Sequence, residues 1–486
     1  MLVCSPEQNY AFERFKQGKN LFITGPGGTG KTRLIHTLTR DCENAGLAYQ
    51  VCALTGCAAI LLGTSARTLH SWSGIKLAKG DRAKIISSAL KSRKGRASWK
   101  KTKILIVDEV SMMSLKIFEI IEEIARTARL SSLPFGGMQV IFTGDFYQLP
   151  PVGTPGEPDT EQFCFESAIW SKVFSLENHI QLRTIFRQAD PKYKEILLQI
   201  RDGTLTKENA DLLQGHVKRT FNSEEHNGCI PTKLFPTRVK TDFLNQSQYN
   251  KLEGPEYTYI YDKKTTCKTY LETGKAIPAG LLEACSGLTL QETEYEIQSL
   301  VSNSNFQESL SLKKGTAVMC TKNLDMDQGI CNGSQGVIVD FVEGPAKTKY
   351  PLVKFVNGIT KIIQLQFHQS DEYPCIAVGQ VPLCMAWALT IHKIQGATLK
   401  MADIDVGMNV FEYGQTYVAL SRVASLEGLY LTAFNPGRIR VHEKVRAFYR
   451  KIPEIAEISA ESVVLDFEKY ENKEETPDPT VKKIKL

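Results

Sequence analysis

The residues best suited to chemistry in this sequence are the eight that read GPGGTGKT, from Gly25 to Thr32. Their spacing fits G-x-x-x-x-G-K-[ST], a phosphate-binding loop whose glycines let backbone N–H groups surround phosphate oxygens. We expect Lys31 to reach the β- and γ-phosphates of ATP, and the Thr32 hydroxyl to bind Mg²⁺. The sequence therefore predicts a nucleoside triphosphate site with ATP and Mg²⁺ as cofactors. The expected nucleotide contacts are Gly25, Gly27, Gly28, Thr29, Gly30, Lys31 and Thr32.

The segments around this loop are of the kind it requires. Residues 21–24 are a short apolar run typical of a buried strand, and residues 33–42 carry apolar side chains at helical spacing. A helix that begins at the loop would point the positive end of its dipole at bound phosphate. Upstream, Ser5 predicts the N-cap of a short helix. Gln8 in that helix either pairs with an adenine edge through its amide or is an ordinary surface residue.

Two adjacent carboxylates, Asp108 and Glu109, follow a second apolar run at residues 104–107. Neighbouring carboxylates repel each other unless a cation lies between them and the phosphates. We therefore expect Asp108 to hold Mg²⁺ through water, and Glu109 to orient the attacking water and accept its proton. Gln148 comes shortly after a strand predicted at residues 139–143, where an amide can sense the γ-phosphate or this water.

Phosphoryl transfer also needs positive charge in its transition state, commonly from an arginine across a domain boundary. Two arginines, Arg187 and Arg422, each close a partly apolar run and are candidates for this role. A surface salt bridge is the alternative for both, and spacing alone does not select them.

Composition limits the class of protein without revealing its function. The chain has 486 residues, of which 42% are hydrophobic and 23% charged, and a net charge of +6; this length suits about three domains. Ten Lys or Arg against one acid lie between residues 76 and 101, which is typical of a nucleic-acid contact or of a solvated face. The twelve cysteines form no C-x-x-C pair, which predicts reduced thiols. The longest apolar run, residues 381–391, is too short to span a membrane and predicts one buried strand.

Strands and helices alternate in two separate regions, which predicts an α/β protein with parallel sheets. The first region covers residues 1–180, and the second begins near residue 233 and resumes at residues 384–432. Between these parts, residues 313–367 contain short β-rich runs separated by turn signals, a pattern typical of a small inserted β-barrel. The charged tail at residues 468–486 is expected to be disordered.

In order along the chain, these motifs resemble superfamily-one DNA helicases of the RecD-like branch. PFGGMQ at residues 134–139, GDFYQLPP at 144–151 and NGSQG at 332–336 are similar to segments of the Pif-type (petite integration frequency) helicases. The resemblance runs from Gln8 to about residue 434. The other segments that carry it are residues 25–32, 55–59, Asp108-Glu109, Arg187, TIHKIQG at 390–396 and VALSR at 418–422.

The resemblance implies an ATP-driven motor that moves 5′-to-3′ along single-stranded DNA and unwinds duplexes or G-quadruplexes, in repair, recombination, replication or telomere maintenance. Two RecA-like domains would clamp ATP, with Arg187 and Arg422 pointing in from the second domain. Uncharged side chains would hold the DNA backbone without sequence preference. The motif positions matched to DNA contacts are Thr55, His70, Ser71, Thr390, His392 and Gln395, and Gly396 is matched to the nucleotide site.

The resemblance also implies a domain order. Residues 1–180 would be RecA-like domain 1A, with a small 1B wedge inserted near residues 66–101. Residues 181–310 and 380–455 would be the second RecA-like domain, 2A. Residues 311–379 would be an inserted SH3-like domain, 2B.

Other functions stay open from the residues alone. An RNA-directed helicase would show the same motifs, because a contact to a 2′-hydroxyl leaves no sequence signal. A P-loop kinase or ATPase without unwinding activity would need only the first half. We expect single-stranded and forked DNA and G-quadruplexes as partners, no membrane, and a monomer. No secretory signal or mitochondrial presequence is visible, so we expect a nuclear location, or the cytoplasm of a bacterium or host. Trp72 and Trp387 are expected to be buried rather than stacked on a base.

Overall fold

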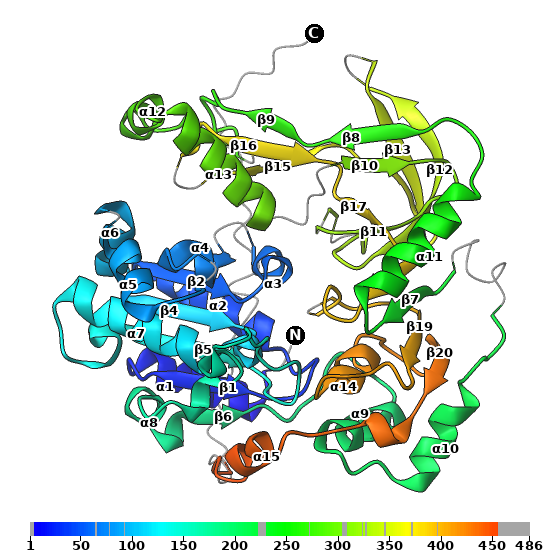
Figure 1. The fold of residues 1–486 in the computed structure, drawn as a ribbon, viewed down its shortest axis with the longest axis horizontal. Helices are drawn as coiled ribbons and strands as arrows, with labels where there is room; N and C mark the ends of the chain where they lie inside the picture. The colour runs from blue at the N-terminus through cyan, green and yellow to red at the C-terminus, as the bar shows by residue number, and fades with distance from the viewer. Residues whose placement is uncertain are drawn as a thin grey trace.

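The computed structural model describes residues 4–454 except for 64–65, 77, 92, 222–229, 272, 304–308, 323, 326–327, 345–346, 371–372 and 396. It contains two parallel sheets, and antiparallel sheets lie beyond the second one (Figure 1). The α/β class and the two parallel sheets predicted from the sequence are therefore confirmed. The tail at residues 468–486 lies outside the described residues.

Six strands form the first parallel sheet, in the order β3-β2-β4-β5-β1-β6. Their bounds are β1 Leu21–Thr24, β2 Tyr49–Ala53, β3 Arg67–Thr68, β4 Ile104–Asp108, β5 Gln139–Gly144 and β6 His179–Gln181. Strand β1 is an interior strand next to the edge strand β6, since Thr24 pairs with Gly144 on one side and with Gln181 on the other. The carboxyl ends of β1, β4 and β5 consequently meet at one edge of the sheet, where ligands bind in open α/β folds.

Both faces of this sheet are covered, as a parallel sheet requires. Leu21 and Ile23 lie in the core shared with α1 and α2, whereas Phe22 lies in the core shared with α7. This alternation follows from the two-residue period of a strand. The helices of this half are α1 Pro6–Lys16, α2 Lys31–Asn44, α3 Gly56–Leu61, α4 Leu69–Ser73, α5 Arg82–Lys91, α6 Arg93–Lys101, α7 Leu115–Arg129 and α8 Trp170–Val173.

The basic segment at residues 76–101 folds mainly into α5 and α6, which pack against α7. Trp72 of α4 and Trp99 of α6 are buried, with ring centroids 4.3 Å apart. Arg82 forms an ion pair with Glu119 of α7 at 2.6 Å. The segment is therefore anchored to the first sheet by an aromatic contact and an ion pair, and Trp72 is buried as expected.

Four strands form the second parallel sheet, in the order β18-β7-β19-β20. Leu234, Ile404 and Leu431 of its strands share one core with Ile196 of α9 and Val418 of α14. The strands are β7 Thr232–Phe235, β18 Ala388–Thr390, β19 Ala402–Val406 and β20 Leu429–Phe434. The helices around them are α9 Pro191–Asp202, α10 Lys207–Gly215, α11 Arg238–Asn250 and α14 Gln415–Leu420.

The β-rich region predicted between the parts of the second sheet is antiparallel. A five-stranded sheet has the order β14-β13-β12-β11-β17, and two smaller sheets have the orders β15-β16-β9 and β10-β8. Leu310 and Leu312 of β10 share a core with Ile338 and Val353 of the larger sheet. The strands are β8 Tyr257–Ile260, β9 Asp262–Lys264, β10 Ser309–Leu312, β11 Ala317–Cys320, β12 Gln335–Glu343, β13 Lys349–Phe355, β14 Thr360–Ile362, β15 Gln366–Gln369, β16 Ala377–Gln380 and β17 Leu383–Met385. Helices α12 Ala279–Ser286 and α13 Leu290–Asn303 flank them.

One disulfide corrects the prediction that the thiols are all reduced. It joins Cys285 of α12 to Cys375, which precedes β16. Cysteines 90 residues apart in the sequence leave no local spacing signal, so only the fold brings them together. Among the described residues, no helix combines the length and apolarity needed to cross a membrane.

The apolar run at residues 381–391 is not one strand, and that prediction is wrong. Its first part, β17, pairs antiparallel with β11, and its second part, β18, pairs parallel with β7. The chain passes from one sheet to the other at Ala386 and Trp387, both buried. Each short strand is covered on both faces, so apolar residues continue through the junction. The sequence pattern therefore does not show where one strand ends and the next begins.

The end of the described chain returns to the first half. Helix α15 (Glu443–Tyr449) lies near α8 and β6 in Figure 1, after the chain leaves β20. Val445, Tyr449 and Ile452 belong to the core of the first sheet. The domain order implied by the family resemblance places residues 380–455 in the second domain, and this packing departs from it for the final helix.

Candidate active site

The phosphate loop connects β1 directly to α2, and its glycines have the backbone conformations that the motif requires. Gly28 and Gly30 have φ angles of +87° and +80°, which residues other than glycine rarely adopt. A Cβ at Gly28 would lie 2.5 Å from Cβ of Arg187, and one at Gly30 would lie 2.7 Å from Nε2 of Gln8. The loop is therefore a close-packed turn with candidate residues on both sides.

Lys31 is the first residue of α2, and its ammonium group turns back over the loop. It donates hydrogen bonds to the carbonyl oxygens of Gly25 at 2.6 Å and Pro26 at 3.0 Å. Burial lowers the pKa of Lys31, while the carboxylates of Asp145, Glu109 and Asp108 oppose this effect. Lys31 is thus a partly buried cation near three carboxylates at the loop.

The carboxylates at the end of β4 form a compact acidic pair. Burial, together with the neighbouring Glu109, raises the pKa of Asp108 to about 6. The Thr143 hydroxyl donates to Asp108, and the Glu109 N–H donates to the same oxygen at 2.8 Å. Glu109 has a left-handed backbone, with φ of 56°, an uncommon conformation that clusters at functional sites. A buried carboxylate destabilised by a second one fits a site for a hard cation such as Mg²⁺.

The two candidate arginines lie at the phosphate loop. Nη2 of Arg422, which follows α14, is 3.6 Å from a Cβ built on Gly27, and Arg187 lies against Gly28. Both arginines donate hydrogen bonds to uncharged oxygens. Arg187 donates to the Ser421 carbonyl at 3.3 Å, and Arg422 donates to the Val418 carbonyl at 3.0 Å. Burial and the neighbouring Arg422 lower the pKa of Arg187 to about 10, and burial lowers that of Arg422. Two neighbouring guanidinium groups, that of Arg422 buried and that of Arg187 partly buried, would gain from an anion such as phosphate.

Gln8 and Gln148 are both buried beside the loop. The Gln8 amide donates to the Thr29 carbonyl at 3.0 Å and accepts from the Ser5 N–H at 3.1 Å. Gln8 therefore braces the phosphate loop as well as being a candidate for adenine. Within the described part of the chain, the Gln148 Oε1 is buried with no hydrogen-bond partner, as expected of an amide that awaits a ligand or water.

The candidate DNA contacts divide between the two halves. Thr55, at the start of α3, accepts a hydrogen bond from the Ala58 N–H. His70 and Ser71 lie in α4, and His70 lines a groove of about 340 Å³ with Lys79, Lys116, Ser114 and Thr154 among its other residues. Thr390 ends β18 and caps the following turn through the Lys393 N–H, and His392 lies 6.4 Å from the Phe411 ring. Gly396 lies outside the described residues.

Gln395 has an unexpected neighbour. Its Nε2 donates to Oε2 of Glu109 at 3.2 Å, across a sequence separation of 286 residues. Gln395 is 4% exposed, and its Oε1 has no hydrogen-bond partner among the described residues. The residue matched to a DNA contact therefore touches the predicted catalytic carboxylate.

Three residues at the loop were missed by the sequence reasoning. The Tyr417 hydroxyl accepts the Gly27 N–H at 2.8 Å, and Ser421 Oγ lies 3.6 Å from a Cβ built on that glycine. The Phe186 ring lies beside Gly30 and is 53% exposed. Their only signal in the sequence is proximity to Arg422 and Arg187, which is insufficient without the fold.

A phosphate loop, two carboxylates at a strand end and two arginines, one from the connection between β6 and α9 and one that follows α14 of the second half, define a P-loop nucleotide hydrolase. The family model described as PIF1-like helicase matches residues 4–211, and that of the DNA helicase Pif1 2B domain matches residues 297–341. The chain belongs to the PIF1-like helicase family.

Individual relatives support the same assignment. The chain is 33% identical to an ATP-dependent DNA helicase PIF1 of Emericella nidulans over 90% of its length, and 33% identical to that of Danio rerio over 97%. It spans 61% and 67% of those two proteins. The crystal structure of the Candida albicans Pif1 helicase matches with a TM-score of 0.71 and 32% identity, covering 93% of this chain and all of that one. A Bacteroides Pif1 in complex with ADP-AlF3 and single-stranded DNA matches with a TM-score of 0.60 and 26% identity, covering 93% and 97%.

Proposed function

We propose that this chain is an ATP-dependent DNA helicase that moves 5′-to-3′ on single-stranded DNA and unwinds duplexes. The observation that carries the proposal is the approach to the phosphate loop of Arg422, from the second half, and of Arg187, from the connection between the halves. Hydrolysis that needs both halves makes their separation depend on the nucleotide, and such a cycle can drive stepping along a strand. Family membership supports this motor function over that of a small-molecule kinase.

The residues of the site have distinct roles in this proposal. Lys31, Arg187 and Arg422 bind the phosphate oxygens and stabilise their developing charge. Glu109 takes the proton of the attacking water, and Gln148 orients that water. Mg²⁺ bound by Thr32 and Asp108 would neutralise phosphate charge.

The domain assignment is part of the proposal. Residues 1–180 form domain 1A, with a 1B insertion near residues 66–101, and residues 181–310 and 380–455 form domain 2A. Residues 311–379 form domain 2B. The six-stranded and four-stranded parallel sheets support the two RecA-like units, and α15 returns to the first one. The antiparallel sheets also contain β8 and β9, which precede residue 311 and pair with β10 and β16, so the β-rich unit extends beyond residues 311–379.

For substrates, we propose single-stranded and forked DNA, with G-quadruplexes as further substrates, bound by a monomer. The groove beside His70 and the segment after Thr390 supply uncharged and basic groups on both halves. A strand bound to both halves would be pulled as they close. Contacts of this kind read the backbone and not the bases.

The test is unwinding of fluorescently labelled duplexes that carry either a 5′ or a 3′ single-stranded tail, with ATP and Mg²⁺. We expect unwinding of the 5′-tailed duplex, and ATP hydrolysis stimulated by single-stranded DNA. Lys31→Ala removes both activities, whereas Lys19→Ala, an exposed lysine just before β1, retains them. Unwinding that requires a 3′ tail refutes the polarity.

The same assay separates the alternatives. Greater stimulation of hydrolysis by single-stranded RNA than by DNA identifies an RNA-directed helicase. Hydrolysis that no nucleic acid stimulates favours an ATPase or kinase without unwinding activity. Analytical ultracentrifugation of the protein bound to a single-stranded oligonucleotide decides whether one copy or several copies bind each strand.

A further inference from the structure

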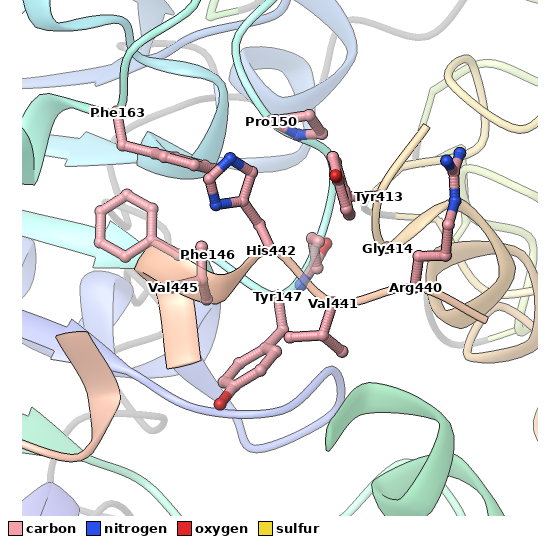
Figure 2. A pocket seen from close by; sticks show the side chains of 11 residues that line it. Phe146, Tyr147, Pro150, Phe163, Tyr413, Gly414, Arg440, Val441, His442 and Val445 are labelled. Carbon is pink, nitrogen blue, oxygen red and sulfur yellow. The ribbon is translucent and has the colours of Figure 1, made fainter. Parts of the chain in front are cut away.

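The segment from residue 439 to residue 452, here called the strap, links the two halves of the molecule. It leaves the second sheet after β20 and ends in α15 against the first sheet (Figure 1). Figure 2 shows strap residues Val441, His442 and Val445 beside Phe146 and other residues of the first half. The cavity enclosed there is about 10 Å³, room for one water at most. The strap is therefore tightly packed where it crosses the boundary.

The hydroxyl of Tyr449, in the last turn of the strap, makes three hydrogen bonds inside the first half. It donates to Oδ1 of Asp145 at 3.1 Å and accepts the Phe146 N–H at 3.1 Å. Since its single proton goes to Asp145, the bond with the Thr24 hydroxyl has Thr24 as the donor. Thr24 is the residue immediately before the phosphate loop, and residues 145–146 begin the segment that leads to Gln148. One hydroxyl thus joins the base of the phosphate loop to the segment that carries Gln148.

The same carboxylate receives a cation from the second half. Nε and Nη2 of Arg201, in α9, donate to the two oxygens of Asp145 at 2.9 and 2.8 Å. The guanidinium also lies over the rings of Tyr147 at 4.2 Å and Tyr449 at 5.2 Å. Both partners of this ion pair are almost fully buried, at 4% and 0% side-chain exposure. A buried pair with bidentate geometry holds its two elements in one orientation.

Helix α9 extends this connection to the arginine at the site. At its other end the Tyr193 hydroxyl donates to the Leu420 carbonyl at 2.7 Å, two residues before Arg422. Gly414, just before α14, also touches the Gln148 segment, because a Cβ there would lie 2.3 Å from the Tyr147 carbonyl oxygen. The phosphate loop, Gln148 and Arg422 are therefore linked through one set of buried contacts.

We propose that Tyr449, Asp145 and Arg201 form a positioning hub for ATP hydrolysis, in which the strap sets Gln148 relative to the phosphate loop. This inference rests on the proposed function. The three residues touch neither nucleotide nor metal in our scheme; they act through the loop that carries Gln148. Displacement of a catalytic group by about 1 Å can lower a rate by roughly 100-fold, so a shared anchor for both loops is a strong constraint.

The variant that tests the hub is Tyr449→Phe, which removes one oxygen and keeps the ring in the core. We expect kcat for hydrolysis stimulated by single-stranded DNA to fall roughly tenfold, with the KM for ATP within about twofold of the parent. The thermal midpoint should stay within a few degrees. Tyr257→Phe, which alters a tyrosine of β8 far from the site, is the matched control and should behave like the parent.

A double variant separates positioning from general weakening of the fold. If the hydroxyl acts by placing Gln148, then adding Tyr449→Phe to Gln148→Ala lowers kcat less than about twofold further. Full multiplication of the two losses overturns the proposal, as does a Tyr449→Phe variant with the kcat of the parent. The parent and Lys31→Ala are measured in the same assay; a parent without ATP hydrolysis refutes the proposed function itself, an outcome distinct from failure of the hub.

Discussion

The two parallel sheets carry different groups beyond the carboxyl ends of their strands. In the first sheet, β1 leads into the phosphate loop, β4 into Glu109, and β5 into the segment that carries Gln148. In the second sheet, β18 leads into the turn that carries Gln395, while Arg422 follows the short helix α14. One half therefore holds the groups proposed to bind phosphate and water, and the other half supplies Gln395 and Arg422, which lie beside these groups.

This difference also appears in the burial of charge. Asp145 of the first half is matched by Arg201 through two hydrogen bonds. Arg187 and Arg422, in contrast, contact carbonyl and hydroxyl oxygens and have lowered pKa values. A buried ion pair holds its two elements together without a ligand, whereas arginines held by neutral oxygens are suited to an anion that comes and goes. We therefore propose that one part of the boundary is held by this ion pair and that another part responds to nucleotide.

The largest effect on ATP hydrolysis is expected from the part of the boundary that carries Arg422. Arg422→Ala should lower the rate of ATP hydrolysis by roughly 1,000-fold, because an arginine that stabilises the transition state contributes on that scale. ADP binding, followed with a fluorescent analogue, should weaken far less. Arg183→Ala removes an exposed arginine paired with exposed Glu454 and should have no effect. Equal losses of binding and hydrolysis would show that Arg422 is only a ground-state contact.

A smaller effect on the rate of ATP hydrolysis is expected from the hydrogen bond between Gln395 of the second half and Glu109 of the first half. Gln395→Ala frees Glu109 from its hydrogen bond, and we expect kcat to fall on the order of tenfold. Stimulation of hydrolysis by single-stranded DNA should fall with it, because the same turn follows Thr390. Stopped-flow phosphate release with and without DNA measures both quantities. Gln246→Ala, on the exposed face of α11, is the control, and matching rates for both variants would contradict the coupling.

The smallest effect on catalysis is expected at His368, which lies in an antiparallel sheet away from the two parallel sheets. His368 lies in β15, and burial, assisted by Lys322, lowers the pKa of its imidazole to about 4. The pKa of His368 is lower in the folded chain than in the unfolded chain. The free energy of unfolding is therefore highest above about pH 6.5, and it decreases as the pH falls towards 4. Between pH 7.5 and 5 the loss is roughly 2 kcal/mol for this one group. Urea unfolding at both pH values should show a smaller loss for His368→Gln, with ATP hydrolysis at pH 7.5 unchanged; equal losses would exclude His368 as the cause.

Much of the first half was predictable from local sequence. The strand at residues 21–24 and the N-cap at Ser5 are found as expected, and the strand at residues 104–107 extends only to Asp108. A glycine-rich loop between an apolar run and a helix has few alternatives, since spacing and residue type follow directly from the backbone turn. The roles of Lys31, Asp108 and Glu109 in hydrolysis stay predictions.

The second half was less predictable because its signals are not local. The division of residues 381–391 between two sheets leaves hydrophobicity unchanged, so periodicity cannot show where β17 ends and β18 begins. Cys285 and Cys375 are far apart in the sequence and carry no motif. Arg187 and Arg422 look like ordinary surface arginines until the resemblance or the fold places them.

The sequence by itself determined the phosphate loop, the acidic pair after β4 and the α/β class, because each depends on neighbouring residues and on the period of one element. Only the tertiary structure decided that Gln395 reaches Glu109, that Tyr449 lies beside Thr24, and that Arg201 pairs with Asp145. These contacts join residues 56 to 425 positions apart. Their energies come from burial and matched hydrogen bonds between separate elements, which no local pattern records.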